Sequence, residues 1–239
     1  MFVAIGISIV VGYLIGSVNF AVLVAKKHGV DILKEGSGNP GATNVKRVLG
    51  KGPGNLVFAL DVLKGVVGTA VGYLSAWFFY VQTQFVKMVA EMPEGILARL
   101  RASLDGFQHP ERYHVDTDIV FAIVVAGFVG TLLGHCFSCF LKFKGGKGVA
   151  STIGGLLVLL PVPILIGATL WGLVFLASRY VSLASIALGV SLPLSCLFLK
   201  YGQSEFWFAA AIAAFNVWTH RSNIGRLLNG TENRFVKQA

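Results

Sequence analysis

The sequence predicts an all-α integral membrane protein that crosses the bilayer about seven times. Its mean hydropathy is +0.73, and 55% of its 239 residues are hydrophobic while only 13% are charged, which is more apolar than a soluble domain of this size. Long apolar runs alternate with short polar segments along the whole chain. We therefore expect one polytopic membrane domain covering residues 1–239.

Six apolar runs define the expected spans, judged against the roughly 20 residues that a helix needs to cross the hydrocarbon core. They occupy residues 2–24, 55–80, 119–134, 149–178, 181–199 and 206–218. The fourth run is the longest, and Pro161 and Pro163 stand near its middle. It forms either one kinked helix or two short helices joined by a proline turn.

The distribution of basic residues favours two helices in the fourth run. Two spans there keep three polar, glycine-containing segments on one face of the membrane, together with most of the lysines and arginines. Cytoplasmic loops carry an excess of these residues, so this face is expected to be cytoplasmic. The prediction is seven spans, with the N-terminus outside and the C-terminus inside.

Residues 81–118 are expected to form an extracytoplasmic polar insertion. Acidic residues outnumber basic ones in this segment, whereas the whole chain carries a formal charge of +9. Apolar residues recur at helical spacing from Phe85 to Leu104, which predicts an amphipathic helix on the outer membrane surface. Pro93 is expected to break that helix.

The three polar segments are called here the first island (residues 36–45), the second island (143–149) and the third island (220–226). Each combines flexible backbone and neutral donors with a nearby basic side chain, which is the chemistry that holds phosphate at a membrane surface. The candidate phosphate-binding and substrate-binding residues are Ser37, Gly38, Asn39, Thr43, Asn44, Arg47, Lys144, Gly145, Gly146, Lys147, Gly148, His220, Asn223, Arg226 and Glu232.

The first island matches the dinucleotide-binding pattern G-x-G-x-x-G from Gly36 to Gly41. No strand precedes it, and it lies between membrane helices, so a Rossmann fold is excluded. A simple turn between two helices is one interpretation. The other is an anion site in which glycine amides approach the ligand, Ser37 and Thr43 add hydrogen bonds, and Arg47 adds charge.

The second island imitates a nucleotide-binding loop, but Leu141 and Gly148 stand where the Walker pattern requires Gly and Ser or Thr. ATP binding is therefore not supported. A Gly-Gly-Lys-Gly turn that opens a helix at Val149 still offers free amides, a positive helix end and the Lys147 ammonium.

In the third island, His220 and Asn223 are three residues apart and can share a helix face, with Arg226 one turn further. Glu232 is the nearest acidic residue that can orient them. Within the second span, Asp61 and Lys64 are also three residues apart. They form either a structural ion pair or part of a cavity wall, because charges within a membrane are costly.

Nucleic-acid binding is not expected despite the positive charge, because the basic residues lie in short loops beside apolar runs. Three cysteines cannot all pair, and Cys136 and Cys139 have no second ligand pair for zinc. No metal site or cofactor-binding pattern is evident.

In their order between these spans, the islands resemble the PlsY family of bacterial membrane glycerol-3-phosphate acyltransferases. That family carries S-G-N-x-G-A-T-N, G-H-x-F-P-x-F-L-x-F-K-G-G-K-G-V-A and H-x-x-N-I-x-R-L-x-x-G-x-E segments. Here they run from Ser37 to Asn44, from Gly134 to Ala150 and from His220 to Glu232. Two departures are Ser138 in place of the usual Pro and a longer segment 81–118.

The resemblance implies a seven-span fold in the bacterial plasma (inner) membrane, with the active site facing the cytoplasm. It implies transfer of an acyl group from acyl-phosphate to the 1-hydroxyl of glycerol-3-phosphate, giving lysophosphatidic acid, with no cofactor. The implied partners are these two substrates, membrane lipids and the enzyme that makes acyl-phosphate. The implied catalytic residues are Ser37, Lys147, His220 and Asn223.

Two features bear on the donor and on other functions. No H-x-x-x-x-D motif of other acyltransferases follows His135 or His220. An organophosphate transporter or exchanger is the alternative function, because glycines and cations between short helices also suit anion passage; a non-catalytic binder of lipid headgroups is another. Against transport, all three islands are expected on one face and no inverted repeat is apparent.

Overall fold

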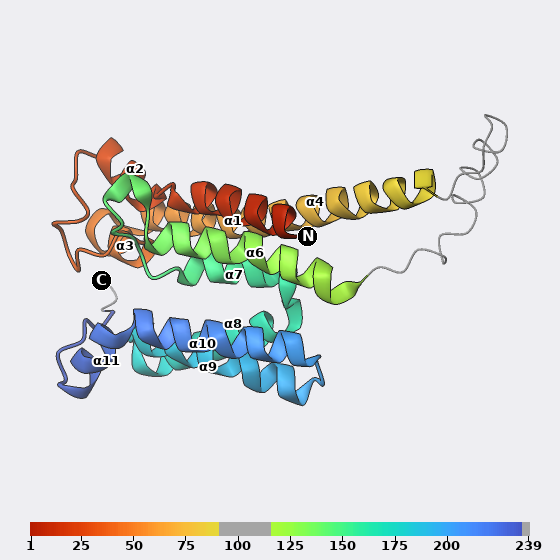
Figure 1. Ribbon diagram of the computed structural model, residues 1–239. Coiled ribbons are helices and arrows are strands. Elements are labelled where there is room, and N and C mark those ends of the chain that lie inside the picture. Colours follow the sequence, from red (N-terminus) through yellow and green to blue (C-terminus); the bar gives the residue numbers. More distant parts are fainter. Residues whose placement is uncertain (91–115, 236–239) are drawn as a thin grey trace.

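A computed structural model of the protein describes residues 1–90 and 116–235, with the side chains of residues 84–90 excepted (Figure 1). Within these ranges the regular structure is entirely helical. The helices are α1 (Phe2–Ser17), α2 (Phe20–Lys27), α3 (Ala42–Leu49), α4 (Lys51–Ala90), α6 (Thr117–Cys136), a 3₁₀ turn η2 (Cys139–Leu141), α7 (Val149–Leu159), α8 (Pro161–Ser178), α9 (Val181–Phe198), α10 (Gln203–Thr219) and α11 (Arg221–Leu228).

Five helical segments of the described chain are long and apolar enough to cross a membrane. They are Phe2–Lys27, Lys51–Thr83, Thr117–Leu141, Pro161–Ser178 and Val181–Phe198. Two shorter helices, α7 and α10, run beside them (Figure 1). The all-helical membrane fold is confirmed, whereas seven crossings and the orientation of the termini stay predictions.

The helices form two layers (Figure 1): α1, α4, α6 and α7 make one, and α8, α9 and α10 make the other. The chain passes between the layers where α7 ends at Leu159 and α8 begins at Pro161. Proline is favourable there because the first helical residues have no intrahelical N–H bond to lose. The fourth apolar run therefore forms two helices rather than one kinked helix.

Small residues let the helices of the first layer approach closely. A side-chain carbon at Gly16 of α1 would overlap the Thr131 carbonyl of α6, and one at Gly65 of α4 would overlap the Ser151 carbonyl of α7. Helices in membranes pack through such small residues because lipid supplies no hydrophobic drive for association. This packing holds α6 and α7 in fixed positions at the end where the islands lie.

The first apolar run breaks between α1 and α2, within the segment Phe2–Lys27 that is long enough for the expected first span. Asn19 caps α2 by accepting a hydrogen bond from the Val22 amide at 3.0 Å. Its amide nitrogen donates to the Pro40 carbonyl at 3.3 Å. The break therefore attaches the first island to the end of α1.

The second apolar run is longer than expected, since α4 begins at Lys51 and continues to Ala90. The expected boundaries 55–80 were too narrow because hydropathy marks the apolar part of a helix and not its polar ends. The predicted amphipathic helix from Phe85 to Leu104 overlaps the end of α4 up to residue 90, and its remainder lies outside the described residues, so the extracytoplasmic insertion stays a prediction.

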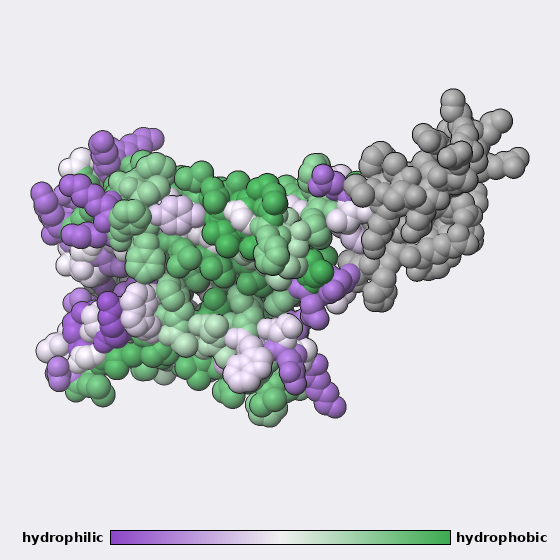
Figure 2. Space-filling view, viewed as in Figure 1, coloured by the Kyte–Doolittle hydropathy of each residue, from purple (hydrophilic) through white to green (hydrophobic). Residues whose placement is uncertain are grey.

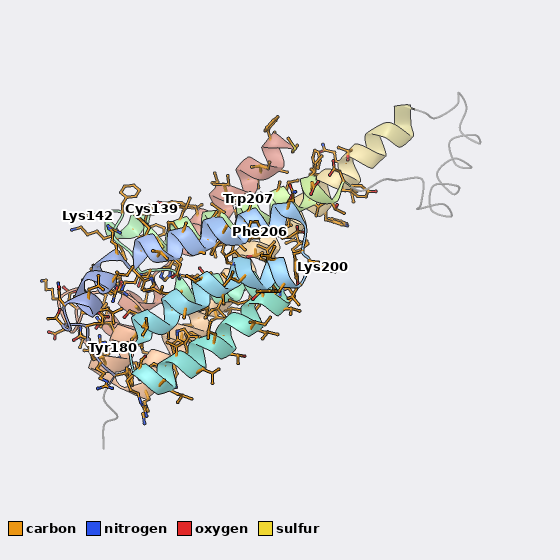
Figure 3. All side chains as sticks on the ribbon, turned by 90° about the horizontal axis from the view of Figure 1, so that it is seen from below. Cys139, Lys142, Tyr180, Lys200, Phe206 and Trp207 are labelled. Atoms are coloured by element: carbon orange, nitrogen blue, oxygen red, sulfur yellow. The ribbon has the colours of Figure 1, made fainter. Side chains whose placement is uncertain are left out.

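The surface agrees with a protein surrounded by lipid. Figure 2 shows hydrophobic residues across the middle of this face and hydrophilic residues at both ends. Figure 3 places Tyr180, in the α8–α9 turn, at the same end as Lys142, and Lys200, after α9, at the opposite end. Helices of the second layer therefore span the molecule from the island end to the other end.

Candidate active site

The three islands come together at one end of the bundle and line a single cavity of about 1000 Å³. Every predicted site residue contributes to its wall except Gly146. Helices α2, α3 and α11, beside the first and third islands, lie at this same end in Figure 1. Segments separated by more than 100 residues therefore form one site.

Asn44 organises the first island. Its Oδ1 accepts hydrogen bonds from the Ser37 amide at 2.9 Å and from Arg47 Nη1 at 3.2 Å. Its Nδ2 donates to the Glu35 carbonyl at 2.9 Å, and Gly38 turns the loop with a left-handed φ of +67°. Because the polar atoms of Asn44 are engaged within the loop, this residue positions Ser37 and Arg47.

Three helix N-termini open on the cavity. Helices α3, α7 and α11 begin after Gly41, Gly148 and His220, and no side chain caps any of the three. Their first N–H groups have no partner within the helix, and the helix dipole places partial positive charge there. Three such ends around one cavity can bind more than one phosphate group.

The second island places Lys147 in contact with the third island. Gly148, with φ +80°, provides the left-handed turn that starts α7, and the Lys147 ammonium donates to Asn223 Oδ1. Burial lowers the pKa of Lys147 to about 8; the charge of Arg226 also lowers it and that of Glu232 opposes the shift. The ammonium is therefore protonated at neutral pH and only partly hydrated.

Glu232 connects the third island to α9. Its carboxylate accepts hydrogen bonds from Asn223 Nδ2 at 2.6 Å, Arg226 Nε at 2.7 Å and the Ser182 hydroxyl at 2.9 Å. Burial raises the pKa of this carboxyl, but the three hydrogen bonds and the Arg226 charge outweigh burial and lower it overall. Glu232 is thus an ionised group that orients Asn223, as expected from the sequence.

His220 stands at the junction of α10 and α11. Its Nδ1 lies 2.9 Å from the Asn216 carbonyl oxygen, which can only accept, so the proton belongs on Nδ1 and Nε2 is the free acceptor. Burial, followed by the charge of Lys147, lowers the pKa of His220 to about 4. The imidazole is neutral at pH 7 and can accept a proton through Nε2.

An aromatic wall completes the cavity on the side of α8. Trp171 and Phe175 stack with their ring centroids 5.0 Å apart, and Phe235 packs edge-on against Phe175 at 5.8 Å. The Trp171 indole donates to the Ser185 hydroxyl at 3.2 Å. Sequence reasoning missed this wall, because aromatic residues four apart in an apolar helix look the same whether they face lipid or a cavity.

The described residues contain no group of three or more His, Cys, Asp or Glu arranged to hold a metal ion. Cys136 and Cys196 are buried and Cys139 is exposed, and all three are free thiols. The ion pair expected between Asp61 and Lys64 is present, at 3.0 Å. Asp61 also lines the cavity, so both interpretations of this pair hold.

Comparison with known proteins identifies the family. The sequence profile described as glycerol-3-phosphate acyltransferase matches residues 6–230. The chain belongs to the glycerol-3-phosphate acyltransferase family. Curated glycerol-3-phosphate acyltransferases from Endomicrobium trichonymphae and Aquifex aeolicus are 37% and 34% identical to it; each alignment covers 95% of this chain, and 93% and 97% of the respective relatives.

Solved structures of the same family share this fold. Two crystal structures of PlsY (YgiH), an integral membrane glycerol 3-phosphate acyltransferase, match the chain at 33% identity. The glycerol 3-phosphate form has a TM-score of 0.73 and covers 97% of this chain and 96% of its own. The lysophosphatidic acid form has a TM-score of 0.70, with 97% and 95% covered. The PlsY resemblance is confirmed, and membership of an acyltransferase family favours catalysis over transport.

Proposed function

We propose that this acyltransferase transfers a fatty acyl group from acyl-phosphate to the 1-hydroxyl of glycerol-3-phosphate. The products are lysophosphatidic acid and inorganic phosphate. The observation that carries the proposal is the meeting of three uncapped helix N-termini with the islands around one cavity. Two phosphate-bearing substrates repel each other, and such a cavity can hold both close together.

The cations and small donors of the site have binding roles in this proposal. Lys147 and Arg47 bind phosphate oxygens through charge-assisted hydrogen bonds, and the Ser37 hydroxyl adds a further donor. The second island contributes its glycine backbone and the amides at the start of α7. Positive charge at these positions also stabilises the charge that develops on the departing phosphate.

His220 and Asn223 align the acceptor. The acceptor hydroxyl attacks the acyl carbon, its proton leaves, and the bond from that carbon to the phosphate oxygen breaks. The proton goes either to Nε2 of His220 or to an oxygen of a substrate phosphate. Since acyl-phosphate is a mixed anhydride with a good leaving group, no covalent acyl-enzyme is needed.

The aromatic wall of Trp171, Phe175 and Phe235 suits the start of the acyl chain. Trp171 donates to Ser185 of α9, one helical turn from Ser182, which contacts Glu232, so the acyl chain can lie among helices while the water-soluble acceptor arrives from the island end. We place that end at the cytoplasmic face of the bacterial plasma (inner) membrane, in a seven-span fold with the N-terminus outside. The enzyme that makes acyl-phosphate would then meet this face.

Cysteine labelling tests the topology. In a background without native cysteines, single cysteines at residues 40, 145 and 223 of intact cells are expected to react only from the cytoplasm. A cysteine at residue 105 is expected to react from outside. Reaction of residue 223 with an impermeant reagent from outside would contradict the seven-span arrangement.

A donor comparison tests the chemistry. Purified protein is expected to form lysophosphatidic acid from acyl-phosphate and glycerol-3-phosphate without ATP or a divalent metal. In detergent no gradient exists, so product formation also separates catalysis from transport. Equal turnover with acyl-CoA in a preparation free of other acyltransferases would show that the proposed donor is wrong.

A further inference from the structure

A buried polar cluster lies directly behind the second island. Lys64 of α4 forms an ion pair with Asp61 Oδ1 at 3.0 Å and donates to the carbonyls of Gly16 and Val18 at 3.2 and 2.8 Å. These carbonyls belong to the end of α1 and the break that follows it. One ammonium therefore ties α4 to the point where α1 ends.

His135, near the end of α6, joins the ion pair to the second island. Its Nδ1 lies 3.7 Å from Asp61 Oδ1 and 3.3 Å from the Ser151 hydroxyl of α7. Its backbone carbonyl accepts a hydrogen bond from the Gly146 amide at 3.1 Å. A side-chain carbon at Gly146 would overlap Nε2 of the same histidine. The loop thus rests on His135 through both its backbone and its ring.

The geometry excludes a serine–histidine–aspartate triad for this cluster. In a triad the acid and the nucleophile engage opposite nitrogens of the imidazole. Here Asp61 and Ser151 both face Nδ1, while Nε2 faces Gly146. The Ser151 side chain is also buried. Ser151 is therefore not arranged as an acyl-accepting nucleophile.

We infer that Asp61, Lys64 and His135 are positioning residues that fix the backbone of the second island for phosphate binding, an inference that rests on the proposed function. The ion pair packs against the ring of His135, and His135 supports Gly146. The adjacent Lys147 and the free amides at the start of α7 are then fixed relative to the third island. The cluster acts through the loop rather than on the reacting atoms.

The test compares two variants of the buried cluster with one control variant of the purified enzyme. Asp61→Asn/Lys64→Met removes both charges together, so neither charge is left buried without its partner. His135→Ala leaves the ion pair in place and removes the imidazole ring behind Gly146, while the backbone hydrogen bond to the Gly146 amide can remain. Thr69→Val is the control: Thr69 is a buried residue of α4 that donates within its own helix to the Gly65 carbonyl at 2.8 Å.

We expect both cluster variants to raise the KM for a phosphate substrate about tenfold, the loss typical of one hydrogen bond to a charged group. Hydrogen exchange of peptides covering 141–149 is expected to accelerate in both, with kcat changing less than KM. Thr69→Val is expected to change KM less than twofold and to leave this exchange unchanged.

Wild-type KM and unchanged exchange at 141–149 in either folded cluster variant would overturn the inference. So would the loss of one limb of the kcat–pH profile in His135→Ala with KM unchanged, because that result would make His135 a proton-transfer group. Exchange is measured without substrate, so it reports on the loop whichever donor the enzyme uses. Wild-type turnover in the same preparation tests the proposed function separately.

Discussion

The two ionic clusters beside the cavity differ in burial, and the difference separates architecture from chemistry. In the inner cluster, the Asp61 and Lys64 side chains are each 3% exposed. In the outer cluster, Glu232 is 8% exposed and Arg226 is 40% exposed. Besides its ion pair with Asp61, Lys64 donates hydrogen bonds to backbone carbonyls at the end of α1, whereas two of the three hydrogen-bond partners of Glu232 belong to the third island. The inner cluster therefore fixes helices, and the outer cluster orients side chains to which the proposed function gives substrate-binding roles.

The largest expected effect comes from breaking the inner ion pair on one side. Lys64→Ala leaves the Asp61 carboxylate buried without a partner, and breaking a buried pair in this way costs about 3–5 kcal/mol. Arg226→Ala at the rim is expected to cost about 1 kcal/mol, because water can solvate the remaining carboxylate. Thermal unfolding in detergent compares the two variants, and equal losses of stability would show that burial does not distinguish the two ion pairs.

The next largest effects are expected from removing the positive charges of Lys147 and Arg47, which line the cavity. Lys147→Ala and Arg47→Ala are each expected to lower kcat/KM roughly tenfold or more, since a hydrogen bond to a charged group contributes about 1.5–3 kcal/mol. Cys136→Ala and Cys139→Ala are the controls and are expected to be nearly silent. Turnover assays and glycerol-3-phosphate binding on folded variants measure both effects. A Lys147→Ala enzyme as active as the cysteine controls would remove Lys147 from the site.

The charge of Lys147 is expected to make activity depend on pH. The pKa of Lys147 is about 8 in the free enzyme, so its positive charge is complete well below pH 8 and is lost as the pH rises through that value. We expect kcat/KM to fall above about pH 8. In an active Lys147→Arg variant the fall should disappear, because arginine stays protonated. A fall that persists unchanged in that variant would assign it to another group.

The smallest expected effect is at Ser182, one of three donors to Glu232. Ser182→Ala removes one hydrogen bond, which typically contributes about 1 kcal/mol, and is expected to lower turnover about fivefold. Ser185→Ala, which loses the Trp171 contact instead, is the matched variant on the same helix. If Ser182→Ala left turnover unchanged while Ser185→Ala lowered it, Glu232 would not need its anchor on α9.

Local chemistry explains which parts of the site were predictable. Glycines around Lys147 predicted a helix start at Val149, and the structure begins α7 there. The three-residue spacing of Asp61 and Lys64 predicted their ion pair in the same way. Both inferences depend on neighbours in sequence, whose geometry a helix dictates.

Long-range contacts explain what was missed. The hydrogen bond from Ser182 to Glu232 joins residues 50 positions apart. Likewise, His135 of α6 lies beside Asp61 of α4. No spacing rule predicts such contacts, because they depend on how helices pack. The break at Asn19 was missed for a related reason. A single Asn in an apolar run does not by itself predict a break, and here the break depends on the Asn19 side chain capping α2.

A double substitution tests most directly whether residues from separate islands form one acyl-transfer site. Purified Lys147→Ala/His220→Ala enzyme is assayed for lysophosphatidic acid formation from acyl-phosphate and glycerol-3-phosphate, with folding checked by its thermal unfolding. The folded double variant is expected to form almost no product while Cys136→Ala remains active. Near-normal turnover by the double variant would show that Lys147 and His220 do not belong to one acyl-transfer site.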